Sequence, residues 1–490
     1  MSRTKVENGK PKTLSPDRGG IKGMERNFQF RFPFLTFSPP LPVSAGIFLI
    51  ILLFALTPDI KADTVTIQEG LSVITSQGYE MRIARAREAA AAQAQDQTLA
   101  RFKPQVKAYA DHTWLQYQPE AIFGAGTSPL SEDRFLRYGV TVKQLITDFG
   151  RTGSSIEAAR AGARGQVEET GRIRNTVALD FLTTYVSLLQ AEKALAIAGL
   201  EVQRFESHVK DARALHMAGE VTLNDVLAAE VALADASLRR ITIQDERNLA
   251  ASRLNYLILR PLDNPTTVVN FPFQLNPIPN LEDLSTRAIA NRSELKILSE
   301  RITAKEAELS SREAENFPTL FVSGGYSYEE NPYRVHEDNW SAMLGLTWEL
   351  YTGGAQTAGR KQVMEELTAL IAQREQVKEL VNLEVRDSHR LLTGALERIS
   401  VIKKAVTQAQ ESLRLQRSRY TEGEATATEV TDAVTSLARA ENNQWKTVYG
   451  RLKAEARLLY ATGDDLVTVY SRSRAMTPGN SLNTETGEDK

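Results

Sequence analysis

Two segments, Arg213–Val226 (RALHMAGEVTLNDV) and Arg417–Val430 (RSRYTEGEATATEV), share the pattern R-x5-G-E-x-T-x2-[DE]-V at an offset of 204 residues. The offset holds without a gap for about 100 residues around them, where it aligns Gly150 with Gly354, Leu233 with Leu437, Leu254 with Leu458 and Tyr256 with Tyr460. A long internal repeat constrains architecture more strongly than any local pattern. The sequence therefore predicts two copies of one structural unit.

Upstream the offset is 214, which aligns Glu80 with Glu294 and Pro104 with Pro318. The difference lies in an insert of the first copy, 118–134 (QPEAIFGAGTSPLSEDR). Each copy is predicted as a helix, a hairpin, a very long helix, a tight turn and a helix. The predicted boundaries are a first repeat at 63–260, a proline-rich linker at 261–281, a second repeat at 282–470 and a disordered polar tail at 471–490.

Helical periodicity dominates both copies. No proline interrupts 153–217, so this stretch is predicted as one helix of about 100 Å, at 1.5 Å per residue. A heptad-like 4-3-4-3 spacing links Leu227, Val231, Ala234, Leu238 and Ile241. Such spacing and length are typical of coiled-coil packing rather than of a compact core.

Four segments are predicted strands: 105–117, 136–149, 319–329 and 340–351. Each has roughly the length of a tilted membrane strand, and aromatic residues cluster near their ends, as in an aromatic girdle. The fourth alternates with a period of two, and its Leu344, Leu346 and Leu350 are expected to face lipid. Two ordinary soluble hairpins are the alternative interpretation.

The N-terminal region has the features of an export signal. The apolar run Ala45–Leu56 follows Lys22, Arg26 and Arg31 and is shorter than the roughly 20 residues of a membrane-spanning helix. It fits the apolar region of a secretory signal peptide with an extended leader, 1–62, and a mature chain from about Asp63. An uncleaved N-terminal anchor is the alternative.

Composition excludes several classes of function. The 490 residues contain no cysteine, so disulfide frameworks, cysteine zinc sites and thiol nucleophiles are absent. The five histidines show no helical metal-pair spacing, and 59 basic against 61 acidic residues argue against nucleic-acid binding. Because no nucleophile–base motif or phosphate loop is present either, we expect no enzyme, no cofactor and no metal site.

Four strands cannot close a barrel. An unclosed sheet in lipid leaves unsatisfied backbone groups, each costing several kcal/mol, so several chains would have to pool their strands. The long helices need partners as well, and neighbouring subunits would supply them. The residues therefore predict a hollow oligomer.

The ordered set of motifs resembles the TolC-like outer-membrane efflux protein family from about Thr66 to Leu466. The motifs are the two turn segments above, Phe102-Lys103-Pro104 and Phe317-Pro318 before the hairpins, and Asp148-Phe149-Gly150-Arg151 and Tyr351-Thr352-Gly353-Gly354 after them. The resemblance implies an α+β membrane protein with two structural repeats. Its fold would be a long helical periplasmic barrel joined to an outer-membrane β-barrel of four strands per chain, in a homotrimer.

The resemblance also implies a function and partners. The protein would be the exit duct of a tripartite export system in the outer membrane of a Gram-negative bacterium. It would sit in outer-membrane lipid, bind a periplasmic adaptor, and pass drugs or secreted proteins from an inner-membrane transporter, of ABC or proton-driven type. A periplasmic coiled-coil adaptor or scaffold is the alternative, although an adaptor would be expected to carry a compact β domain instead of two matching hairpins.

Within that resemblance the two turns are the periplasmic tips, and the insert 118–134 is an extracellular loop. The tip residues expected to dock an adaptor are Arg213, Gly219, Glu220, Thr222, Arg417, Gly423, Glu424 and Thr426. A tight reversal favours glycine, and each threonine is placed to cap the next helix, with Asp225 or Glu429 completing a capping box. A purely structural capping role is therefore the simpler reading of the threonines.

The resemblance assigns a gate to the second tip. Glu429 and Asp432 match the acidic positions that ring the constricted entrance, and Tyr420 matches a tyrosine of the gating network. Ala425 replaces the arginine that the family prototype has after the turn, so the closed state is expected either to be held less firmly or to be held by Arg417 or Arg419 instead. In the first copy the matching residues are His216, Asp225 and Ala228. Alternatively, both carboxylates are solvated helix residues and Glu429 serves only the cap.

Overall fold

The computed structural model describes residues 63–271 and 278–472. The predicted signal peptide and residues 473–490 of the predicted tail lie outside the described residues, whereas residues 471 and 472 of that tail are helical. One helix pair opens each repeat: α2 (Ile67–Gln77) and α3 (Tyr79–Leu99) in the first, α6 (Leu281–Asn291) and α7 (Ser293–Ala314) in the second. Among the described residues, no helix combines the length and apolar character needed to cross a membrane.

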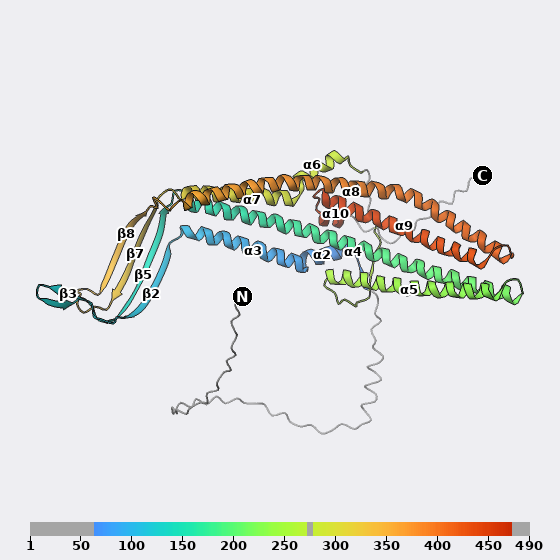
Figure 1. Cartoon of the computed structure of the whole chain (residues 1–490), viewed down its shortest axis with the longest axis horizontal. Coiled ribbons are helices and arrows are strands. Elements are labelled where there is room, and N and C mark those ends of the chain that lie inside the picture. The colour runs from blue at the N-terminus through green and yellow to red at the C-terminus, as the bar shows by residue number, and fades with distance from the viewer. Residues whose placement is uncertain (1–62, 272–277, 473–490) are drawn as a thin grey trace, which may run out of the picture. The chain divides into compact units, whose positions relative to one another are not determined.

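The longest helices follow the strands and confirm the repeat register (Figure 1). Helix α4 (Arg151–Met217) and helix α8 (Ala355–Thr421) have 67 residues each and start 204 positions apart. Their successors, α5 (Leu223–Leu257) and α9 (Ala427–Ala461), have 35 residues each and keep the same offset. The predicted helix of about 100 Å is therefore confirmed. Each long helix separates its strands from the turn at its far end by about that length.

Strands from both repeats form one antiparallel sheet in the order β2-β5-β7-β8. These are β2 (Gln105–Trp114), β5 (Arg134–Thr147), β7 (Thr319–Glu329) and β8 (Asp338–Thr347). The insert, predicted as a loop, contains a further hairpin of β3 (Glu120–Phe123) and β4 (Gly126–Pro129). Alternation in the insert was too short to indicate these strands.

The fourth strand ends earlier than predicted. Strand β8 stops at Thr347, which pairs with Thr319, the first residue of β7. Thr319 is preceded by Pro318, which has no backbone N–H to continue the hydrogen bonding between β7 and β8. Leu350 therefore lies outside the strand, and only Leu344 and Leu346 keep the predicted face.

A tight junction joins each sheet half to its long helix. Phe149 and Gly150 adopt φ values of 54° and 99°, and Gly353 and Gly354 repeat them at 64° and 87°. The side chain of Asp148 accepts a hydrogen bond from the backbone N–H of Thr152 at 2.9 Å, which caps α4. The motifs after the hairpins are thus explained by a strand-to-helix bend that needs two left-handed residues.

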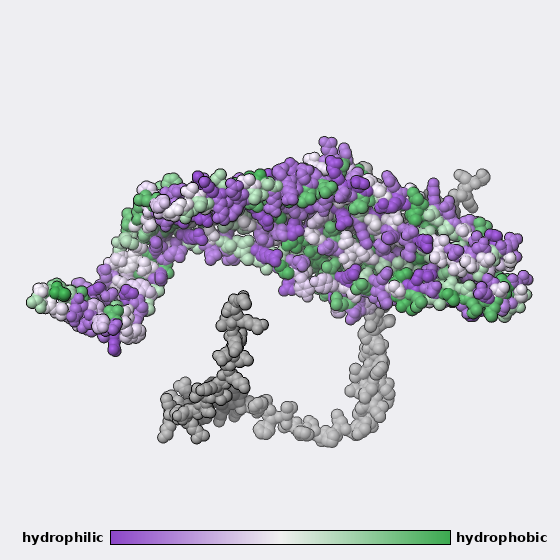
Figure 2. All heavy atoms as spheres, viewed as in Figure 1, coloured by the Kyte–Doolittle hydropathy of each residue, from purple (hydrophilic) through white to green (hydrophobic). Residues whose placement is uncertain are grey.

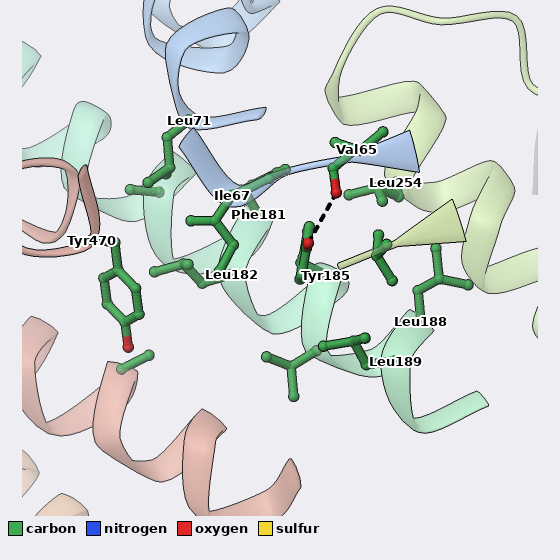
Figure 3. Packing of buried hydrophobic residues seen from close by; sticks show 14 of the residues in the cluster. Val65, Ile67, Leu71, Phe181, Leu182, Tyr185, Leu188, Leu189, Leu254 and Tyr470 are labelled. Carbon is green, nitrogen blue, oxygen red and sulfur yellow. Dashed lines mark hydrogen bonds between the residues drawn. The ribbon is translucent and has the colours of Figure 1, made fainter. Parts of the chain in front are cut away.

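The helices pack in the order α5, α4, α9, α8, since α4 contacts α5 and α9, and α9 contacts α8. The largest apolar cluster lies midway along α4, where it includes residues of three short elements that the sequence analysis did not predict. Strand β1 (Asp63–Val65) pairs in parallel with β6 (Thr266–Val268) inside the predicted linker, and α10 (Leu466–Arg472) packs alongside. The Tyr185 hydroxyl bonds the carbonyl of Val65 at 2.9 Å (Figure 3).

Candidate functional site

Both tips are closed by the same backbone geometry. Gly219 and Gly423 adopt φ values of 80° and 76°, a left-handed conformation that costs glycine nothing sterically. The next residue then reaches back across the turn: the N–H of Glu220 donates to the carbonyl of Leu215 at 2.9 Å. The N–H of Glu424 donates to the carbonyl of Arg419 at 2.8 Å in the same way. These six-to-one bonds satisfy carbonyls that a helix end leaves free.

Both predicted capping boxes are confirmed. Thr222 caps α5 with Asp225, whose carboxylate accepts from the Thr222 N–H at 3.0 Å. Thr426 caps α9 with Glu429, whose carboxylate accepts from the Thr426 N–H at 2.7 Å. That backbone hydrogen bond holds the pKa of Glu429 below its usual range. Glu429 is thus an anionic cap.

The two tip arginines make different contacts. Arg213 pairs with Glu230 of α5 at 2.6 Å, inside its own hairpin. Arg417 reaches across to α4, where it pairs with Asp211 at 3.3 Å and bonds the Ser207 hydroxyl. Arg417 thus joins the second tip to α4, and its expected role in holding the closed state stays a prediction.

Arg419, the other candidate for holding the closed state, stays within its own turn. Its guanidinium donates to the carbonyl of Glu424 at 3.1 Å. Asp432 is exposed on α9, one turn beyond Glu429, and takes no part in the cap that Thr426 and Glu429 form. In the first tip, Nδ1 of exposed His216 lies 3.0 Å from the carbonyl of Val221.

The tips share an apolar core that joins the repeats. Residues of all four helices contribute to it, including Phe205 of α4, Val226 of α5, Leu413 of α8 and Val430 of α9. Beside this core, Arg204 of α4 makes an ion pair with Glu441 of α9 through two hydrogen bonds. The two tips are therefore one packed unit within the chain.

Tyr420, expected in a gating network, is buried in this core with 2% of its surface exposed. Its ring lies 5.0 Å from that of His208, edge to face at 64°. His208 is only 1% exposed, and sequence analysis missed it. Its spacing from Phe205, Val209 and Ala212 on one apolar face of α4 was the available signal. The Tyr420 hydroxyl and Nε2 of His208 have no hydrogen-bond partner among the described residues.

Among the described residues no group of three or more His, Asp or Glu side chains could hold a metal ion. At the tips, Asp225 and Glu429 belong to the capping boxes and Arg213 and Arg417 to ion pairs, while Asp432 is exposed.

The chain leaves an apolar helix face and two strand edges without a partner among the described residues. The predicted heptad seam on α5 is exposed instead of packed within the chain: Leu227, Val231, Leu238 and Ile241 are each at least half exposed. Figure 2 shows apolar side chains gathered along α5. In addition, β2 and β8 are edge strands of the four-stranded sheet.

The register separates the sheet into two faces. One carries aligned apolar residues such as Val140, Tyr326 and Trp340. The other carries Lys143 aligned with Ser323 and Met343, and an ion pair of Arg137 with Asp111 at 3.0 Å. The first face is largely apolar and the second is mixed, with apolar residues such as Phe321 among the polar ones. A difference of this kind is typical of strands with one side in lipid and the other in water.

Comparisons with known proteins agree with this geometry. The family model of the outer membrane efflux protein matches residues 73–258 and 284–464. The chain is 22% identical to the proteases secretion protein PrtF of Dickeya chrysanthemi over 56% of this chain and 61% of that one. It is 21% identical to the outer membrane protein TolC of Salmonella enteritidis over 65% and 67%. The match to PrtF thus spans under two thirds of that relative's length.

The fold has solved counterparts. The outer membrane protein VceC of Vibrio cholerae superimposes with a TM-score of 0.71 at 17% identity, covering 82% of this chain and 96% of that one. The Neisseria gonorrhoeae MtrE outer membrane channel gives a TM-score of 0.67 at 18% identity, covering 82% and 89%. The resemblance stated from the motifs is confirmed by the family match: the chain belongs to the outer membrane efflux protein family.

Proposed function

We propose that the protein is the exit duct of a tripartite export system. As a family member it is an outer-membrane protein, not an enzyme. The four-stranded sheet carries the proposal: it is largely apolar on one face, mixed on the other, and open at both edges. Such a sheet fits one segment of a wall between lipid and a water-filled lumen, completed by further copies of the chain.

The helical part supports the same assembly. The seam of Leu227, Val231, Leu238 and Ile241 has heptad spacing and lies open on α5, the outer helix of its layer. An exposed apolar stripe of this kind is typically covered by a partner helix. A homotrimer would bury it against a second copy and would at the same time pair β2 of one chain with β8 of the next.

The tips supply the docking and gating functions of the proposal. Arg213, Glu220 and Thr222 in the first tip, and Arg417, Glu424 and Thr426 in the second, would meet a periplasmic adaptor linked to an inner-membrane transporter. Gly219 and Gly423 shape these turns. Tyr420, Glu429 and Asp432 would form the gate, with Tyr420 acting through its buried packing and Asp432 facing the opening.

Deletion of the gene in its native host tests this function. We expect loss of export, seen as retention of a secreted protein or accumulation of an efflux dye, and recovery with the wild-type gene. Membrane fractionation of the complemented strain should recover the protein from the outer membrane as an oligomer. Recovery of a soluble monomer from the periplasm, with export unaffected by deletion, would overturn the proposal.

A further inference from the structure

His208 is a titratable group in a place that disfavours its charge. It lies on α4 nine positions before the last residue of the helix, and the core residues Phe205 and Val209 flank it. Its ring contacts Tyr420, which precedes the final residue of α8. Burial lowers the pKa of His208, and a backbone hydrogen bond with Ala427 of α9 only partly opposes this.

The neighbouring charges do not change that balance. On α4 itself Asp211 favours the charged imidazole, but Arg417 of α8 disfavours it, and these two groups are ion-paired with each other. From α5, Asp225 acts on Tyr420, whose burial raises the pKa of its hydroxyl. An imidazolium at this position would bury an Nε2–H that has no acceptor among the described residues.

We propose that neutral His208 is the positioning residue that holds Tyr420, and with it the second tip, against α4. Protonation of His208 would expel its ring from the core and release the end of α8. The inference rests on the proposed function, because it takes the tips to be the entrance of the duct. It adds a proton-controlled step to a second tip in which Glu429 is fixed in a cap and Arg417 in an ion pair.

The direction of the pH dependence follows from the lowered pKa. A histidine released to solvent titrates near 6.5, whereas the packed ring titrates below that value. The released state therefore binds more protons than the packed state in the window below about pH 6.5. The packed tip is fully favoured above that pH and loses stability as the pH falls towards the pKa of the packed ring.

Spin-label distances measure this release directly. Because the chain has no cysteine, labels at Met217→Cys and Thr421→Cys report only on the ends of α4 and α8. In the full-length oligomer we expect a narrow distance distribution at about pH 7.5 and a longer, broader one at about pH 5. His208→Phe keeps a ring of similar shape without a titratable group, so it should give the narrow distribution at both values.

The control is His216→Gln, which removes an exposed histidine of the first tip and should respond to pH as the wild type does. If His208→Phe fails to assemble, His208→Gln, which is also neutral at both pH values, takes its place. A pH response that survives either His208 variant, or a wild type with no response, would overturn the inference. These distances do not require conduction, so a released tip in a protein that forms no channel would count against the proposed function alone.

Discussion

Arg204 of α4 donates two hydrogen bonds to Glu441 of α9, at 2.9 and 2.8 Å, and so joins the first repeat to the second. Both side chains are largely buried, with 20% and 14% exposed. This pairing lies beside the tip core and links α4 to α9. It ties the first hairpin of helices to the second within one chain.

Removing the arginine should therefore destabilise the tips. Arg204→Ala leaves the Glu441 carboxylate partly buried and unpaired, and we expect a loss of roughly 3 kcal/mol. Thermal unfolding followed by circular dichroism measures it. The matched control is Arg414→Ala, which breaks the solvent-exposed pair with Glu411 and should leave the transition unchanged. Equal effects of the two substitutions would contradict the linking role of Arg204.

The two faces of β8 should differ in their tolerance of charge. Leu346→Arg places a cation on the apolar face and should cost about 2–4 kcal/mol if that position lies near the bilayer midplane. Met343→Arg, on the opposite face of the same strand, should be tolerated. Heat-modifiable migration of the assembled protein, extracted from membranes, reports both. Normal assembly of Leu346→Arg would refute the assignment of this face to lipid.

Glycine at the second tip should be irreplaceable for conformational reasons. Gly423→Ala forces an alanine into φ near 76° and should cost about 1–2 kcal/mol. Gly162→Ala, within α4 and facing open space, should instead stabilise by about 0.5–1 kcal/mol. Thermal unfolding of the two variants should thus move in opposite directions. A neutral Gly423→Ala would mean that the turn does not depend on the left-handed residue.

Much of this arrangement was predictable from the sequence because the repeat carries it. The 204-residue offset predicted a turn between two helices at equivalent places in both repeats, and the spacing of Thr222 and Thr426 from their acidic partners predicted both caps. The alternating pattern within 340–351 does not show where pairing with the neighbouring strand stops. The end of β8 depends on Pro318, which precedes the β7 residue that pairs with Thr347. The His208–Tyr420 contact joins residues 212 positions apart, and only tertiary packing reveals such a pair.

The exposed carboxylate of Asp432 should tune ion selectivity. Three copies would place three such charges around one axis, which favours cations. Asp432→Asn removes the charge without touching the cap formed by Thr426 and Glu429. We expect a weaker cation preference and weaker block by multivalent cations, measured as reversal potentials under a salt gradient. Asp235→Asn on α5, outside the tip turns, should change neither. Unaltered selectivity in Asp432→Asn would remove Asp432 from the gate.

Electrical recording across a planar lipid bilayer tests the central claim, that the assembled chain is a duct. The purified oligomer, from about residue 63 onwards, should insert and produce discrete, uniform conductance steps. Its assembly state should be verified in the same preparation by light scattering. Steps from the oligomer, and none from Leu346→Arg, are the predicted result. A folded, oligomeric protein that inserts into the bilayer and never conducts would contradict the account.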